Sequence, residues 1–168
     1  MTATEEFIDK LMGLKVGALG LLRTHADLDL DESVEGFDLF AGLWWPLRQK
    51  NERAPRREVA WLITKLYACH PVPHSPDNTF AHQMRCCQPG EEAVGSKRFR
   101  QKFDEILLSP LSSIEPSLRW ATGVIDASGR GLDWVKLTDS LSKWERIETR
   151  LEWAEDYMRI EKGNHHVD

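Results

Sequence analysis

Five cationic side chains gather in a short stretch near the middle of the chain, directly after two tryptophans. The cations are Arg48, Lys50, Arg53, Arg56 and Arg57, with Glu52 and Glu58 among them and Trp44 and Trp45 before them. Lys and Arg neutralise phosphates, and exposed aromatic rings stack on bases, so the stretch is typical of a site that holds a single strand. In a second interpretation, which stays open, the arginines pair with the acidic residues between positions 27 and 35. We expect both tryptophans in the core because of their large apolar area.

A second cationic run stands at the start of a predicted helix. It consists of Lys97, Arg98, Arg100 and Lys102, with no acidic residue among them. The helix dipole disfavours cations at this end, whereas a phosphate is attracted to the free N–H groups there. The run therefore indicates a phosphate contact, unless Arg98 and Lys102 only flank the apolar seam beside Asp104 and Glu105.

Histidines and cysteines lie close together farther along, but their spacing is not that of a metal site. The residues are Cys69, His70, His74, His82, Cys86 and Cys87. They include no pair of cysteines two residues apart and no HExxH motif, and three cysteines make no disulfide framework. Phosphate-cradling and nucleophile-elbow motifs are absent from the sequence as well. We predict no bound metal, no cofactor and no enzymatic activity.

The charge of the chain is unevenly distributed along its 168 residues. The net charge is −5, which argues against a nucleic-acid-binding protein that is basic throughout. Residues 1–40 hold three cations and nine anions, residues 41–110 eleven and seven, and residues 111–168 eight and eleven. Positive charge is thus concentrated in the middle, where a local patch can steer a polyanion. The apolar runs are short and the first residues are acidic, so we expect a cytoplasmic protein without contact to a membrane.

The periodicity of the apolar residues predicts an all-α fold. One long helix is expected from a capping box at Thr2 and Glu5 to about Leu22, and a short one from Phe37 to near Pro46. Further helices are predicted after Pro55, after a cap at Asn78, and from near Ser96, Pro116, Asp133 and Ile147. The last helix carries an apparent apolar face of Ile147, Leu151, Ala154 and Met158.

A proline-rich segment divides the predicted helices into two groups. Pro71, Pro73 and Pro76 cannot continue a helix and indicate a linker. We expect a small N-terminal helical unit in residues 1–76 and a C-terminal helical bundle in residues 77–168.

Several motifs in the second half of the chain resemble one known family. They are Ser96-Lys97-Arg98-Phe99, Leu107-Leu108, Ser117-Leu118-Arg119, Gly131-Leu132-Asp133-Trp134-Val135-Lys136-Leu137 and Leu141-Ser142-Lys143-Trp144. Upstream, Trp44-Trp45-Pro46, Pro55-Arg56-Arg57-Glu58 and Leu66-Tyr67-Ala68 continue the likeness. Over most of residues 1–160 the chain thus resembles the CasB family, the small subunits of the type I-E CRISPR surveillance complex Cascade.

The resemblance implies a two-part helical protein that does no chemistry and helps to hold an R-loop open. Its implied partners are the backbone and large subunits of Cascade, a second copy of itself, the guide RNA and the displaced DNA strand. The positions that match the family's nucleic-acid-binding residues are Arg23, Arg56, Arg57, Lys97, Arg98, Arg119, Lys143 and Arg146.

The chain also departs from the family pattern. Residues 107–111 replace an acidic-basic turn of the relatives and remove one expected cation. Arg119 has a second possible role, as the partner of Glu115 one helical turn earlier. An alternative function is a helical adaptor that binds an acidic protein surface without touching nucleic acid.

Overall fold

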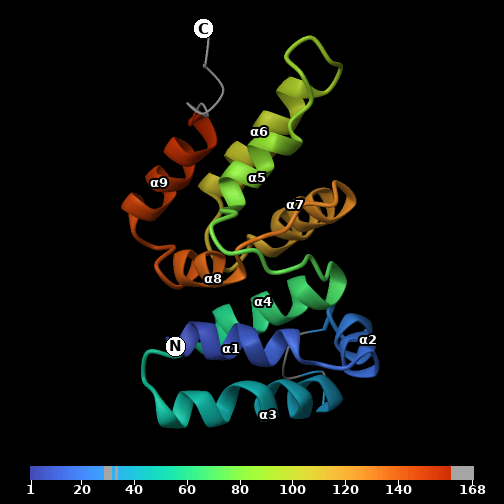
Figure 1. The fold of residues 1–168 in the computed structure, drawn as a ribbon, viewed down its shortest axis with the longest axis vertical. Helices are drawn as coiled ribbons and strands as arrows, with labels where there is room; N and C mark the ends of the chain where they lie inside the picture. Colours follow the sequence, from blue (N-terminus) through green and yellow to red (C-terminus); the bar gives the residue numbers. More distant parts are fainter. Residues whose placement is uncertain (29–31, 33, 160–168) are drawn as a thin grey trace, which may run out of the picture.

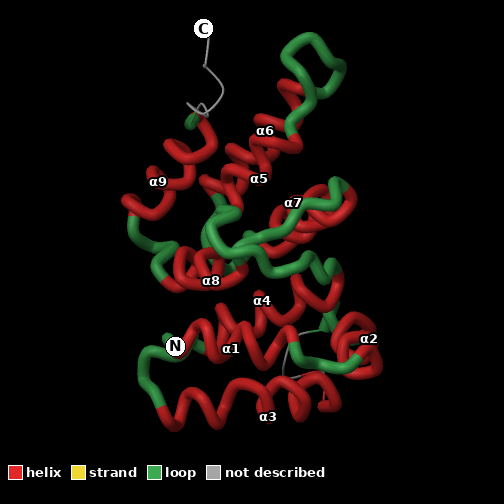
Figure 2. The backbone as a smooth tube through the Cα atoms, in the orientation of Figure 1, coloured by secondary structure: helices red, strands yellow, loops and turns green. Residues whose placement is uncertain are grey.

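The computed structural model describes residues 1–28, 32 and 34–159. These residues form nine helices and no β-strand, which confirms the all-α prediction (Figures 1 and 2). In chain order the helices are α1 (Ala3–Met12), α2 (Val16–Thr24), α3 (Val34–Lys50), α4 (Arg57–Cys69), α5 (Phe80–Cys87), α6 (Ser96–Leu108), α7 (Glu115–Ala127), α8 (Trp134–Ser142) and α9 (Ile147–Met158). Within this part of the chain, no helix has both the length and the apolar composition to span a lipid bilayer.

The first four helices form the small N-terminal unit and the last five the C-terminal bundle (Figure 1). In the first unit, α1 packs on α3, and α2 packs on α4. In the bundle, α5 packs on both α7 and α9. The predicted two-part helical architecture is thereby confirmed, while the division at residue 76 stays a prediction.

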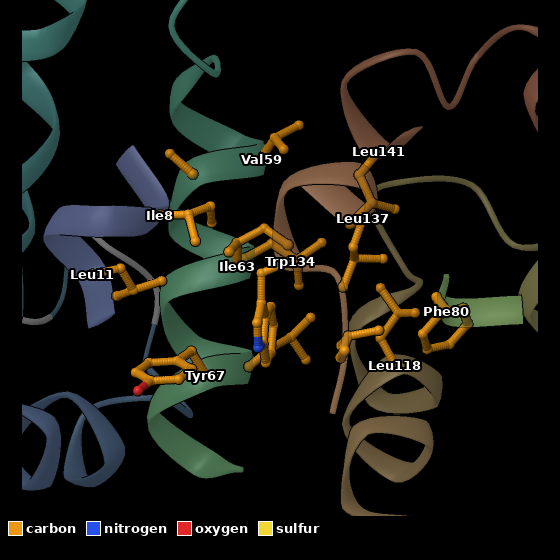
Figure 3. Packing of buried hydrophobic residues seen from close by; sticks show 14 of the residues in the cluster. Ile8, Leu11, Val59, Ile63, Tyr67, Phe80, Leu118, Trp134, Leu137 and Leu141 are labelled. Carbon is orange, nitrogen blue, oxygen red and sulfur yellow. The ribbon is translucent and has the colours of Figure 1, made fainter. Parts of the chain in front are cut away.

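The two groups of helices share one apolar core. Ile8 of α1 and Ile63 of α4 face Trp134 and Leu137 of α8, and Leu118 of α7 lies beside them (Figure 3). All five are at most 2% exposed. Burial of these side chains fixes α8 against α1 and α4.

The expected single N-terminal helix is wrong, because the structure divides it. The capping box at Thr2 and Glu5 is present, but α1 ends at Met12 with Gly13 as its C-cap, and α2 begins after an extended Lys15. Glycine weakens a helix, and the interruption lets α2 turn and pack on α4. Periodicity alone missed the break because apolar residues recur on both sides of it.

The predicted end of the next helix near Pro46 is also wrong, since α3 runs on to Lys50. A proline inside a helix removes one hydrogen bond and crowds the carbonyl four residues earlier. Here that residue is Gly42, and both Gly42 and Pro46 are exposed, so water can reach the unpaired carbonyl.

The proline-rich linker is bonded to the start of α8. Ser75 N–H donates to the Leu132 carbonyl at 2.9 Å, and Leu132 N–H donates to the Pro73 carbonyl at 3.0 Å. A side chain at Gly131 would meet Ser75 Cβ at 2.6 Å, so this close approach requires glycine. The predicted cap at Asp133 is confirmed, because its carboxylate accepts from Lys136 N–H at 3.0 Å.

Two further local predictions are wrong. Thr79 rather than Asn78 is the N-cap of α5. On α9, Ile147 and Leu151 are exposed, whereas Trp153 and Tyr157 are buried. The Tyr157 ring stacks on Phe103 with centroids 4.1 Å apart. Aromatic rings bury more apolar area than aliphatic side chains and therefore decide which face of α9 turns inward.

Candidate nucleic-acid interface

The structure separates the predicted nucleic-acid-binding residues into three groups. The first group comprises Arg56 in the loop between α3 and α4, Arg57 at the start of α4, and Lys143 and Arg146 in the loop between α8 and α9. The second group is Arg23 of α2 and Arg119 of α7, and the third is Lys97 and Arg98 at the start of α6. Figure 1 shows α3 at the bottom of the long axis and α6 in the upper half. The first and third groups therefore lie in different parts of the molecule.

Two members of the first group, Arg56 and Lys143, line a hollow of about 790 Å³. We call residues 51–56, between α3 and α4, the connector, and this cavity the connector hollow. It is lined by Met1, Thr2, Ala3, Thr4, Arg48, Asn51, Arg53, Ala54, Pro55, Arg56, Asp139, Ser142 and Lys143. Four of these side chains are cations and one is a carboxylate, Asp139. The net positive charge of the connector hollow suits an anion, and the walls of the hollow come from both helical units.

The shape of the connector follows from two sets of hydrogen bonds to its carbonyl groups. Trp44 Nε1–H donates to the Pro55 carbonyl at 2.6 Å. Arg48 Nη1 donates to the carbonyls of Glu52 at 2.7 Å and Ala54 at 2.8 Å. The connector is thus folded back on the end of α3. At the opposite wall, Thr4 donates to Asp139 at 2.7 Å and holds α1 against α8.

Arg56 links the connector to the loop after α8. Its Nη2 donates to Glu145 Oε1 at 2.5 Å, and its Nε lies 3.8 Å from Glu58. A hydrogen bond from its own backbone and the Arg56 guanidinium lower the pKa of Glu145. The Arg56 side chain is still 40% exposed, so one edge of it faces solvent.

Arg53, which lines the connector hollow, and the other cations of the first group have no such partner. Arg53, Arg57, Lys143 and Arg146 are exposed, and none forms an ion pair within the described part of the chain. Their charges are compensated only by water and salt ions. A polyanion can therefore bind them without first breaking an internal contact.

Arg119 lies in a different setting, which we call the Arg119 junction and define by Arg23, Asp27, Cys69, Glu115 and Arg119. The Arg119 guanidinium donates to Asp27 at 2.6 Å and to Glu115 at 2.8 Å, and its side chain is 25% exposed. The alternative prediction, a pair with Glu115, is confirmed. A role for Arg119 in strand binding stays a prediction.

Two other members of the Arg119 junction are also held internally. Arg23 Nε donates to the Ala68 carbonyl at 2.9 Å. Burial raises the pKa of the Cys69 thiol, although Arg119 and Arg23 lie near enough to lower it. The thiol is therefore protonated at neutral pH and is a poor nucleophile.

The start of α6 forms a third, smaller cationic patch. Lys97 and Arg98 are exposed and form no ion pair with a described residue. The two later cations are engaged, because Arg100 pairs with Asp104 at 3.1 Å and Lys102 lies 4.6 Å from the centre of the Trp120 ring. The α6 patch thus offers two free cations at a helix N-terminus without acidic residues.

The histidines and cysteines do not converge. Cys86 Sγ lies 3.7 Å from His82 Nε2. Across residues 1–28, 32 and 34–159, no three His, Cys, Asp or Glu side chains are placed to hold a metal ion.

Comparison with known proteins decides the family. A family model for the CRISPR-associated protein Cse2 matches residues 18–158. The chain belongs to this family. The match confirms the resemblance to CasB and covers the connector, the Arg119 junction and the α6 patch. Among proteins with curated descriptions, none matches the chain.

Solved structures of Cse2-family proteins share the fold of this chain. CasB of M. ruber is 19% identical with a TM-score of 0.73, and the alignment covers 94% of this chain and 93% of that one. A Cse2-family protein of Thermus thermophilus is 22% identical with a TM-score of 0.72, over 94% and 99%. CasB of Thermobifida fusca is 15% identical with a TM-score of 0.70, over 94% and 96%.

In this Cse2-family protein, the positions that match the family's nucleic-acid-binding residues do not include Arg48, Arg53 or Trp45. The two arginines belong to the first cationic stretch, and the hollow now places them beside Arg56 and Lys143. Trp44 is 9% exposed, as expected for a core residue, but Trp45 is 50% exposed, contrary to expectation. Neighbouring positions on a helix face different directions, and this was the available signal.

Proposed function

We propose that this Cse2-family protein is a non-catalytic subunit of a CRISPR Cascade complex that holds the displaced DNA strand of an R-loop. The observation that carries the proposal is the connector hollow, where cations from both helical units surround one cavity. Exposed cations without internal partners bind phosphates independently of base sequence. The displaced strand has no fixed sequence, so this kind of binding suits it.

Weak contacts are sufficient for this task. An R-loop exchanges a DNA duplex for an RNA–DNA duplex of similar stability, so modest backbone contacts shift the balance. Binding of a single strand through five phosphates gives a log-log salt slope of roughly −3.5, at about −0.7 for each contact. We expect this slope from the connector hollow together with the α6 patch.

The proposal includes the partners implied by membership in Cascade. These are the backbone and large subunits, a second copy of this chain, and the guide RNA beside the displaced strand. No metal or cofactor and no cleavage step is required, because the cations act by charge alone. The site residues are Arg56, Arg57, Lys97, Arg98, Lys143 and Arg146, with Arg23 and Arg119 in a supporting position.

The test measures retention of the displaced strand in the assembled complex. The variants are Arg56→Ala/Arg57→Ala and Lys97→Ala/Arg98→Ala. Each should make the strand more accessible to a single-strand nuclease. The Lys97→Ala/Arg98→Ala variant removes two unpaired cations and should lower the magnitude of the salt slope by about 1.4, and Arg56→Ala/Arg57→Ala by about 0.7, because Arg56 is already paired with Glu145 and Glu58. Lys10→Ala/Arg130→Ala removes two exposed, unpaired cations of the described chain outside the hollow and serves as the control.

The same experiment distinguishes strand binding from the alternative function, a helical adaptor that binds an acidic protein surface. Unchanged protection of the strand in both double variants, together with loss of other subunits from the complex, would favour binding to an acidic protein surface. Equal effects of the control and the test variants would show that only total charge matters and would contradict a defined site.

A further inference from the structure

We propose that Trp45 stacks on an unpaired base of the strand whose phosphates bind in the connector hollow. The inference rests on the proposed function and deepens it, because it names unpaired bases, and not only phosphates, as a group that this surface binds. It starts from the one tryptophan with a widely exposed ring. Trp45 is 50% exposed, whereas Trp44, Trp61, Trp134, Trp144 and Trp153 are at most 9% exposed and Trp120 is half-buried.

The Trp45 ring is fixed next to the connector by its neighbours in the sequence. Its centroid lies 5.8 Å from that of Trp44, at an interplanar angle of 52°. Trp44 is buried, and its indole N–H is bonded to the Pro55 carbonyl, directly before Arg56. One anchor therefore sets the position of the exposed ring relative to the connector cations. A fixed ring loses little freedom when a base stacks on it.

The cation nearest to Trp45 along the helix lines the connector hollow. Arg48 follows three residues later on α3 and lines the connector hollow. Side chains three residues apart on a helix are neighbours, with about 5–6 Å between their Cβ atoms. A nucleotide whose phosphate binds at Arg48 thus has its base within reach of the Trp45 ring. Cations beside an exposed aromatic ring are the combination that binds single strands.

A protein partner is the competing occupant of the Trp45 ring. Phe37 and Val34 are also exposed on α3. Phe37, however, is eight residues away, which is more than two helical turns. The positions three and four residues from Trp45 on the helix are Ala41, Gly42, Arg48 and Gln49, which add little apolar area. Apart from Trp44, the positions around the ring carry one cation, Arg48, and no large apolar side chain, and this favours a nucleotide.

The experiment compares two probes of equal charge on the full chain. A labelled oligo(dT) and an abasic oligonucleotide of the same length are titrated by fluorescence anisotropy at several salt concentrations. A stacked base contributes about 1–3 kcal/mol, so the wild type should bind oligo(dT) about 5- to 150-fold more tightly. Trp45→Ala should remove this preference and leave the salt slope unchanged, and Trp45→Phe should retain part of it.

Each result has a defined meaning. A wild-type preference that persists in Trp45→Ala would overturn the role of Trp45. Equal wild-type affinity for both probes with a steep salt slope would overturn base stacking and leave the phosphate site intact. No salt-dependent binding of either probe would overturn the proposed function. Unchanged affinity of Trp45→Ala for both probes, with loss of other subunits from the assembled complex, would assign the ring to a protein partner. Thermal unfolding of each variant checks the fold.

Discussion

The connector hollow and the Arg119 junction contain the same kind of side chain in opposite electrostatic settings. At the junction, Arg119 is bound to Asp27 and Glu115 and is largely shielded from solvent. At the hollow, Arg53 and Lys143 are exposed and form no ion pair with a described residue. Both places join elements that are distant in the sequence, but only one leaves positive charge for an external anion.

The difference shows why a count of cations does not locate a binding surface. A guanidinium that already has two carboxylate partners must lose them before it binds a phosphate, and it gains little by the exchange. An exposed cation loses only water and salt ions. The arrangement of carboxylates around each arginine therefore separates the two regions more clearly than their numbers of cations.

The largest effect should come from the carboxylate that the junction shares with α4. Glu115 accepts from Arg119 at 2.8 Å and from Lys65 Nζ at 2.5 Å, and the Lys65 side chain is only 11% exposed. Glu115→Ala leaves that lysine unpaired, so we expect the free energy of unfolding in urea to fall by about 2–4 kcal/mol.

A matched control for this variant is Glu105→Ala, an exposed carboxylate of α6 without an ion pair among the described residues. It should change stability by less than about 0.5 kcal/mol. If Glu115→Ala weakens strand binding as strongly as loss of the hollow's cations, in a chain that is still folded, the separation of the two regions fails.

A smaller effect, on binding rather than on stability, is expected at the hollow. Arg53→Ala/Lys143→Ala removes one free cation from each helical unit and should lower the affinity for a single strand about tenfold at low salt. The salt slope should decrease by about 1.4 in magnitude, because two phosphate contacts are lost. Arg119→Ala, measured alongside by anisotropy, should leave the slope unchanged. Similar slopes for both variants would mean that Arg119 exchanges its carboxylates for phosphate.

The smallest effect concerns Glu145, the carboxylate that pairs with Arg56. Glu145→Gln removes one negative charge beside the hollow and leaves Arg56 with the more distant Glu58 as its carboxylate partner, so single-strand affinity at neutral pH should rise about two- to fivefold. Weaker binding of this variant would indicate that Glu145 holds Arg56 in its binding position.

The stability difference between the wild type and Glu145→Gln should depend on pH. A hydrogen bond from its own backbone and Arg56 lower the pKa of Glu145. Such a carboxyl group stabilises the fold above its unfolded pKa and loses that contribution as the pH falls through the folded pKa. Wild type and Glu145→Gln should therefore differ slightly in thermal unfolding at neutral pH and converge in acid. A difference that grows toward acid pH would contradict this assignment.

Features that depend on a few neighbouring residues were predictable from the sequence. The capping box of Thr2 and Glu5 and the cap at Asp133 lie where the residue types placed them. Two other features were not predictable from neighbouring residues. The break at Gly13 depends on the packing of α2 on α4, and the continuation of α3 through Pro46 depends on the solvent around Gly42. Local preference is a weak guide where tertiary contacts compete.

The candidate site was predictable only in part for the same reason. The cationic stretch around Arg56 is visible in the sequence, and the family motifs mark Lys143. Their meeting at one cavity depends on the contact of α1 with α8, which joins residues 135 positions apart at Thr4 and Asp139. The exposure of Trp45 depends on which of two adjacent indoles fills the core beside Phe40, and Trp44 stacks there at 5.6 Å.

The attachment of the proline-rich segment to the start of α8 has a consequence for the entropy of binding. Pro73 and Ser75 are bonded to Leu132, and Trp134 Nε1–H donates to the Val72 carbonyl at 2.8 Å. The segment between α4 and α5 is therefore fastened to the start of α8 and does not act as a hinge. The two walls of the connector hollow are therefore at their final spacing before a strand binds. The entropy cost of ordering these walls belongs to folding, and binding of the strand does not have to include it.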